Sequence, residues 1–186
     1  MTYSDLSVAE FLRAVAAREP APGGGAVAAV GVAAAAALAA MAARFSPRMD
    51  DLAERADLLR AEVLPLADAD ATAYGRVLAA YRISRDAPER AGQIAAALSE
   101  AADTPLAIAE IGAEVAAIGA RVLDAGNPNL RGDALAAVRM AAAGVRTAAG
   151  LARMNLAQAG ITDDRERRAG AAVVAAIAAE ERADRP

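Results

Sequence analysis

The chain has 186 residues, a formal net charge of −4 at pH 7 and no Cys, His or Trp. Without Cys and His it can form no disulfide, zinc finger or iron–sulfur cluster, and no nucleophile of the Cys–His or Ser–His–Asp type. Its acidity and its aromatic content of 3% disfavour nucleic acid as a partner and favour an acidic soluble partner or a small ligand.

This length predicts a single domain spanning residues 1–186. The N-terminal residues lack a basic segment followed by an apolar run, so no signal peptide is predicted and the expected location is the cytoplasm. Residues 26–43 carry no charge and are long enough for a membrane span to be considered. Because they are mostly Ala, which contributes little to membrane insertion, we predict a buried helix of a soluble bundle and no membrane partner.

Strong helix formers fill every long segment, and no strand is predicted. The first helix is expected to begin at Ser7, within a capping box, and to stop before Pro20. An Ala-rich helix then extends to about Phe45. A long helix from about 47 to 83 follows, with Pro65 inside it as a kink or a break.

Four more helices are predicted at about residues 87–102, 103–126, 130–159 and 162–182, each bounded by Pro, Gly or capping residues. The predicted fold is therefore all-α: a bundle of about six or seven helices with long Ala-rich helices in its core.

Gly23, Gly24 and Gly25 open the Ala-rich helix. Free backbone N–H groups at such a helix start could hold a carboxylate or another anion. A flexible helix start explains the same three residues, and the residues alone favour that explanation.

Proton transfer in this chain falls to Asp, Glu, Tyr, Arg or water, and one carboxylate lies on a helix face suited to it. Helical steps place Asp70 on one stripe with Tyr74, Val77 and Tyr81. A carboxylate held against such a face gains proton affinity and could serve as a general acid or base. Solvation of Asp70, or its pairing with an Arg, fits the sequence equally well.

Two further polar sites lie at the ends of the segment 130–159. An Asx turn explains Asn127, and the first helical turn explains Asp133, although such groups could also read the edge of a heterocycle. Asn155 shares a helical face with Asp133 but lies about 33 Å further along the axis. The two could meet at one ligand only if a second, antiparallel subunit brought them together.

Four segments of the chain together resemble the cyclodeaminase/cyclohydrolase family. They are, in order, FLRAVAAREPAPGGGAVAAVGVAAAAALAAM from Phe11, LADADATAYGRVLAAYRI from Leu66, TPLAIAE from Thr104, and GNPNLRGDALAAVRMAAAGVRTAAGLARMNL from Gly126. The family includes the C-terminal domain of formimidoyltransferase-cyclodeaminase and stand-alone bacterial proteins.

The resemblance implies a homodimeric enzyme that acts on one-carbon units of tetrahydrofolate. Cyclodeamination closes 5-formimidoyltetrahydrofolate to the 5,10-methenyl compound with loss of ammonia, and cyclohydrolysis opens the methenyl compound to 10-formyltetrahydrofolate. The family's proposed acid/base aligns with Asp70, and Asp68 is the local alternative. No metal is expected, because His is absent and the carboxylates show no ligand spacing.

The resemblance also suggests which residues bind the folate. They are Gly23, Gly24, Gly25, Tyr74, Asn127, Asp133 and Asn155. The chain departs from the family at Ala26 and Gly132, where Ser is usual, and at Leu151, where Asn is usual. These departures remove polar groups from the expected pocket and leave one alternative function open: a non-catalytic helical dimer that binds a ligand or acts as a scaffold.

Overall fold

A computed structural model describes residues 2–185, and every regular element in that range is a helix. Two 3-10 turns occur, at Tyr3–Asp5 and Pro128–Leu130. The eight α-helices are α1 (Val8–Val15), α2 (Gly24–Arg44), α3 (Asp50–Val63), α4 (Leu66–Tyr81), α5 (Arg90–Glu100), α6 (Asp103–Ala125), α7 (Arg131–Ala159) and α8 (Asp164–Ala183). The all-α prediction is confirmed.

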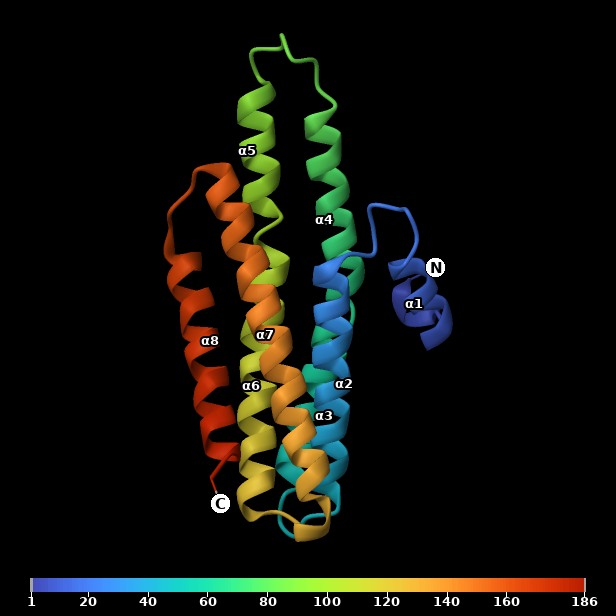
Figure 1. The fold of residues 1–186 in the computed structure, drawn as a ribbon, viewed down its shortest axis with the longest axis vertical. Coiled ribbons are helices and arrows are strands. Elements are labelled where there is room, and N and C mark those ends of the chain that lie inside the picture. The colour runs from blue at the N-terminus through green and yellow to red at the C-terminus, as the bar shows by residue number, and fades with distance from the viewer. Residues whose placement is uncertain (1, 186) are drawn as a thin grey trace.

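The helix count exceeds the predicted six or seven because Pro65, which was expected to be a kink or a break, divides the segment 47–83 into two helices. α3 ends at Val63 and α4 starts at Leu66. Proline has no backbone N–H and its ring clashes with the preceding helical turn, so an uninterrupted helix is disfavoured there. The break frees α4 to pair with α5 in the hairpin that extends beyond the other helices in Figure 1.

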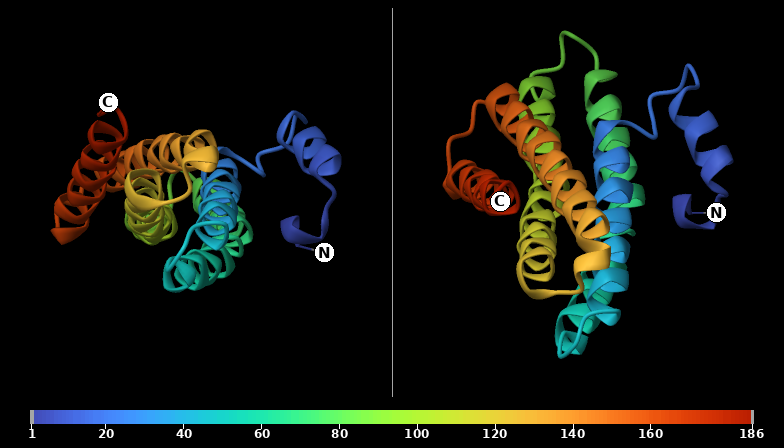
Figure 2. Two further views of the ribbon diagram at one scale, coloured as in Figure 1. Left: turned by 90° about the horizontal axis from the view of Figure 1, so that it is seen from below. Right: turned by 60° about the horizontal axis from the view of Figure 1, so that its bottom comes forward.

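The centre of the bundle is formed by α2, α6 and α7, which pack against one another along their lengths. In Figure 1, α2 and α7 lie towards the viewer, with α3 behind α2 and α6 behind α7. Helix α8 closes one side against α6 and α7, whereas α1 stands apart from the bundle in both views of Figure 2.

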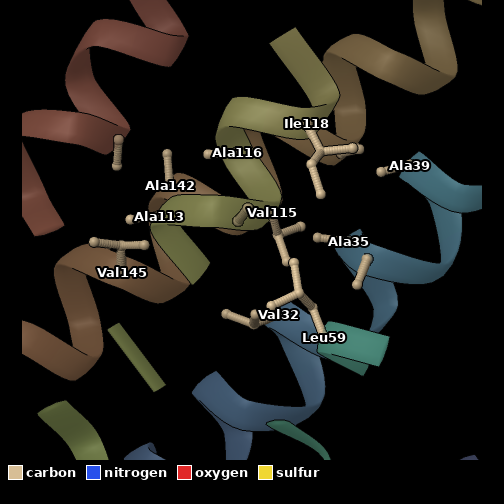
Figure 3. Packing of buried hydrophobic residues seen from close by; sticks show 14 of the residues in the cluster. Val32, Ala35, Ala39, Leu59, Ala113, Val115, Ala116, Ile118, Ala142 and Val145 are labelled. Atoms are coloured by element: carbon tan, nitrogen blue, oxygen red, sulfur yellow. The ribbon is translucent and has the colours of Figure 1, made fainter. Parts of the chain in front are cut away.

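Small residues let the central helices approach closely. Ala occupies most of the buried positions of α2, and Figure 3 shows the few larger side chains, among them Val32, Leu59 and Val115, filling the space between α2, α3 and α6. A Cβ added at Gly144 would lie 2.5 Å from Val32 Cγ2, so α7 and α2 are in contact at a point that only Gly allows.

Two helical segments, Gly24–Arg44 and Pro128–Ala159, are long and apolar enough to cross a membrane by length and composition alone. Much of each is buried inside the bundle, 61% of the first apolar window and 50% of the second. The predicted burial of residues 26–43 within a helical bundle is confirmed, and the absence of a membrane partner stays a prediction.

The N-terminal arm, which comprises residues 2–15, is held to the bundle by a polar contact. The predicted capping box is present, because the Ser7 side chain accepts a hydrogen bond from the Glu10 backbone and the Glu10 carboxylate accepts one from the Ser7 backbone. Ahead of it, the Tyr3 backbone N–H donates to Asp68 Oδ1 at 2.9 Å. The arm therefore lies beside α4, and the residues between α1 and α2 reach the site described next.

Candidate active site

A cleft of about 430 Å³ opens at the end of the bundle where α2 begins and α7 ends. Its walls come from the segment before α2, from the first turn of α2, from α4 and α5, and from the last turns of α7. These segments are far apart in the sequence, so the cleft exists only in the folded chain.

Asp70 faces the cleft from α4 and lies against the first turn of α2. A Cβ atom at Gly25 would overlap the Asp70 carboxyl group, whereas one at Gly23 would meet nothing within 4 Å and one at Gly24 would lie 3.6 Å from Leu151 Cδ1. All three glycines line the cleft, but close approach requires glycine only at Gly25. The anion held at this helix start is the protein's own carboxylate.

Burial raises the pKa of the Asp70 carboxyl above its ordinary value, because removal from water disfavours the charged form. The backbone N–H of Ala26, at the positive end of α2, acts in the opposite direction but less strongly. Within residues 2–185 no Arg shifts this pKa. Asp70 is thus a half-buried carboxyl without a neutralising cation, able to take up and release a proton in the cleft.

The stripe predicted along α4 is confirmed, since Asp70, Tyr74, Val77 and Tyr81 all line the cleft. Val77 and Leu98 of α5 are each 3% exposed and form an apolar floor. Tyr74 and Tyr81 are 44% and 46% exposed, so these two aromatic side chains border the cleft at its solvent-exposed edge. This combination suits a ligand with a flat ring and a solvated tail.

The opposite wall belongs to the end of α7. Asn155 and Gln158 face the cleft there, together with Leu151 and Met154. The Asn155 Nδ2 atom donates to the backbone carbonyl of Ala101 at 2.8 Å, so this side chain has a defined orientation.

Three of the residues expected at the site lie outside the cleft. Asp68 accepts the hydrogen bond from the Tyr3 backbone and anchors the N-terminal arm. Asn127 lies at the far end of α7, where its Oδ1 accepts from the Asn129 backbone at 3.0 Å and its Nδ2 donates to the Phe45 carbonyl at 3.1 Å. Asp133 lies in the first turn of α7, also at the end remote from Asn155.

Several cleft residues were not expected from the sequence. Gln158 could have been found, because it follows Asn155 by three residues on the same helical face. The sequence around Leu98 and Ala101 does not indicate a place in the cleft, since these residues reach it only through the packing of α5 against α4 and α7.

Among the residues that the structure describes, no group of three or more Asp and Glu side chains could hold a metal ion. Metal-independent chemistry stays a prediction. The proton-transfer groups of the cleft in this part of the chain are the Asp70 carboxyl and the Tyr74 and Tyr81 hydroxyls.

The family model described as formiminotransferase-cyclodeaminase matches residues 7–176, which is nearly the whole chain. This chain belongs to the formiminotransferase-cyclodeaminase family. The crystal structure of formiminotetrahydrofolate cyclodeaminase from Thermotoga maritima has the same fold, with a TM-score of 0.85 and 29% sequence identity over 97% of this chain and 94% of the other.

Two curated proteins of this family are also similar. Methenyltetrahydrofolate cyclohydrolase of Methylorubrum extorquens is 30% identical over 157 residues, which cover 77% of this chain and 76% of that protein. Formimidoyltransferase-cyclodeaminase of Mus musculus is 33% identical over 120 residues, covering 57% of this chain and only 22% of the mouse protein. The family resemblance expected from the sequence is confirmed.

The structure locates the departures from the usual family pattern. Ala26, next to Gly25 in the chain, is fully buried and does not line the cleft, Leu151 does line it, and Gly132 lies at the remote end of α7. Only the change at Leu151 therefore alters the cleft surface directly, and it makes that wall more apolar.

Proposed function

We propose that this protein is a folate one-carbon enzyme that acts on the carbon bridging N5 and N10 of tetrahydrofolate, as a formimidoyltetrahydrofolate cyclodeaminase or a methenyltetrahydrofolate cyclohydrolase. The observation that carries the proposal is Asp70, a carboxyl with raised pKa in a cleft of about 430 Å³. The names of the relatives in its family support the substrate class.

Both reactions need one group that moves a proton twice. In cyclohydrolysis the Asp70 carboxylate takes a proton from the water that attacks the methenyl carbon. It then returns the proton to N5 as the bond between that carbon and N5 breaks, while the hydroxyl on the carbon loses its own proton to water and becomes the formyl C=O, so one proton is released overall. In cyclodeamination the formimidoyl group enters in its protonated form, and the carboxylate takes the proton from N10 as N10 attacks the formimidoyl carbon. The carboxyl then gives that proton to the resulting amino group, which leaves as ammonia as the methenyl cation forms. Since both paths pass through a tetrahedral carbon between N5 and N10, one site serves either reaction.

The test begins with purified protein and 5,10-methenyltetrahydrofolate, whose near-ultraviolet absorbance is followed in a buffer that hydrolyses it slowly. Loss of absorbance faster than the uncatalysed rate identifies a cyclohydrolase. A gain of the same absorbance from 5-formimidoyltetrahydrofolate, with ammonia released in equal amount, identifies a cyclodeaminase. If neither rate exceeds the uncatalysed one, the proposal is rejected in favour of the non-catalytic ligand-binding or scaffold protein.

Two copies of this chain are proposed to associate through what we call the α2–α7 face. The face consists of exposed, uncharged side chains: Val27, Ala34, Ala37 and Phe45 on or next to α2, and Met140, Ala143 and Met154 on α7. Phe45 and Met154 are 66% and 57% exposed, which is costly for large apolar side chains unless a partner covers them.

The α2–α7 face adjoins the cleft, because Met154 belongs to both. An antiparallel pair of copies across it would bring the Asp133 end of one α7 towards the Asn155 end of the other. That arrangement would give Asp133 the role in folate binding that its position in one copy does not allow. The cytoplasm remains the proposed location, since it supplies folates to an enzyme of this kind.

A further inference from the structure

The junction between α5 and α6 lacks one helical hydrogen bond. In a continuous helix the Ala101 carbonyl would accept from the backbone N–H of residue 105, but residue 105 is Pro and has no N–H. Ala101 is 6% exposed and Pro105 is buried, so water does not easily replace that donor. A buried carbonyl without a donor is unfavourable, and the fold must supply one from elsewhere.

Asn155 supplies the missing donor from α7, through the bond of 2.8 Å from its Nδ2 to the Ala101 carbonyl. A carbonyl oxygen can only accept a hydrogen bond, so the amide nitrogen of Asn155 must face Ala101. This contact uses one of the two N–H groups and fixes which way the amide points, so the amide oxygen, on the other side of the group, is left as an acceptor for the cleft that Asn155 lines. The proline on one helix thus sets the orientation of an amide on another.

Arg165 fixes the same junction from the outside, although it lies on α8. Its guanidinium donates to the Ser99 carbonyl, to the Ser99 hydroxyl and to Asp103 Oδ1, each at 2.8 Å. Ser99 and Asp103 flank Ala101 on its two sides, and the Arg165 side chain is only 17% exposed. A partly buried guanidinium with several donors engaged holds its partners in a defined geometry, unlike an exposed ion pair.

We propose that the Asn155 amide oxygen is a fixed hydrogen-bond acceptor that selects an N–H donor on the reduced pterin ring, with Arg165 as a positioning residue that holds Ala101 in place. This inference rests on the proposed folate function for the identity of the ligand. The orientation of the amide rests on the Ala101 contact alone. The acceptor lies on the α7 wall of the cleft, and Asp70 lies on the α4 wall, so the ring is recognised from one side while proton transfer takes place from another.

Two substitutions of Asn155 test the acceptor. Asn155→Leu removes it, and we expect KM for the folate substrate to rise about tenfold or more while kcat stays within about threefold, because a ring contact is made equally in the ground and transition states. Asn155→Asp keeps an oxygen acceptor but loses the donor to Ala101, so the acceptor is no longer held; we expect KM to rise about threefold to tenfold, as in Arg165→Gln below and less than in Asn155→Leu. If Asn155→Asp raises KM as much as Asn155→Leu does, Asn155 acts as a donor to the ligand and the inference is wrong.

The positioning role has a matched control on the same helix. Arg165→Gln should raise KM about threefold to tenfold with kcat nearly unchanged, because the junction loosens and the amide is no longer held. Arg168→Gln breaks an ion pair of similar length between α8 and Glu110 of α6, at 2.7 Å, but leaves the junction intact. Equal effects of the two substitutions on KM would assign Arg165 a merely structural role.

A measurement on the ligand-free protein separates this inference from the proposed function. The chain has three Asn residues, so a spectrum with ¹⁵N-labelled Asn side chains is simple to assign. The Asn155 side-chain protons should exchange with water more slowly than those of the exposed Asn129, and the Arg165→Gln variant should lose this protection while Arg168→Gln keeps it. Exchange as fast as at Asn129 in the wild-type protein rejects the fixed amide, whether or not the protein turns over a folate. Protection without turnover would reject the folate ligand and retain the oriented acceptor.

Discussion

At the scale of single residues, the cleft depends on one carboxyl group placed where its charge is unfavourable. Asp70 has a raised pKa because burial outweighs the help it receives from the Ala26 backbone N–H. The same burial that weakens the fold makes the carboxyl a better proton acceptor near neutral pH. The proposed function of Asp70 and the stability of the fold therefore oppose each other at this position.

The activity of the Asp70→Asn variant tests the catalytic role. Asn has the same shape but cannot take up a proton, so we expect the variant to fold and to turn over its folate substrate at least about 100-fold more slowly. Steady-state kinetics and circular dichroism measure the two properties. Turnover close to the wild-type rate would remove Asp70 from the mechanism.

The thermal stability of Asp70→Asn should rise, although its turnover should fall. A carboxyl whose folded-state pKa is raised lowers stability as pH rises from its unfolded-state pKa through its folded-state pKa. Asp70→Asn should therefore have a higher Tm than the wild type at pH 7, and the difference should vanish as pH falls towards about 4, the unfolded-state value of Asp. A Tm below that of the wild type at pH 7, in calorimetry across this range, would contradict the burial argument.

Glycine at position 25 gives a second test at this scale. The methyl group of Gly25→Ala would overlap the Asp70 carboxyl, so the carboxyl must turn away from its position in the cleft. We expect kcat to fall by about 10-fold to 100-fold, which is typical of a displacement near 1 Å of a reacting group. Gly75→Ala is the control, because Gly75 lies on the same helix as Asp70 and a Cβ added there would have no atom within 4 Å. If Gly25→Ala and Gly75→Ala have the same kcat, Gly25 does not position Asp70 and serves only as a flexible start of α2.

At the scale of the helices, the central helices pack through close contacts between Ala and Gly residues, where other bundles use large side chains. The Gly112 position on α6 would place a Cβ 2.8 Å from Val145 Cγ2 on α7, and Gly144 on α7 approaches Val32 on α2 in the same way. The three central helices are therefore spaced by backbone-to-side-chain contacts, with little room for rearrangement.

This spacing predicts the effect of a single methyl group. Gly144→Ala should destabilise the protein by about 1 to 3 kcal/mol, despite the better helix propensity of Ala, because the added Cβ would lie 2.5 Å from Val32 Cγ2. Gly92→Ala on α5, where an added Cβ meets nothing within 4 Å, should instead stabilise it by up to about 1 kcal/mol. Chemical denaturation of both variants measures the difference, and a Gly144→Ala variant as stable as Gly92→Ala would show that α2 and α7 can separate without loss.

At the scale of the whole molecule, apolar surface is distributed unevenly. The α2–α7 face exposes large and small uncharged side chains, whereas the outer surface of the α3, α6 and α8 helices carries ion pairs such as Arg55–Glu114 and Arg168–Glu110. A contiguous exposed apolar surface is typical of an interface, and the symmetric pair of copies proposed above would cover this one.

A charge on the α2–α7 face should separate the proposed dimer. Ala34→Arg places an arginine on the exposed side of α2, and we expect sedimentation velocity to show a monomer where the wild type shows a dimer. Ala175→Arg, also at an exposed Ala but on α8, should leave the dimer intact. A wild type that sediments as a monomer, or an Ala34→Arg variant that still sediments as a dimer, would exclude this face as the interface.

Much of the fold was predictable because its signals are local. Ser7 with Glu10 marked the start of α1, and the glycine after Ala159 marked the end of α7, since caps and breakers act within one helical turn. Pro65 was recognised as an interruption, but whether it kinks or breaks the helix depends on how α3 and α4 pack, which one segment does not reveal. The periodicity of α4 likewise placed Asp70, Tyr74 and Tyr81 on one face correctly.

By itself, then, the sequence determined the helical class, the face of α4 that carries Asp70, and the family. Only the tertiary structure decided that Gly25 touches Asp70, that Asp68 anchors the N-terminal arm, and that Asn127 lies at the other end of the bundle from Asn155. Contacts within one helix follow from 3.6 residues per turn, whereas contacts between helices depend on crossing points that many Ala-rich sequences could set differently. The cleft and the orientation of Asn155 are products of those crossings.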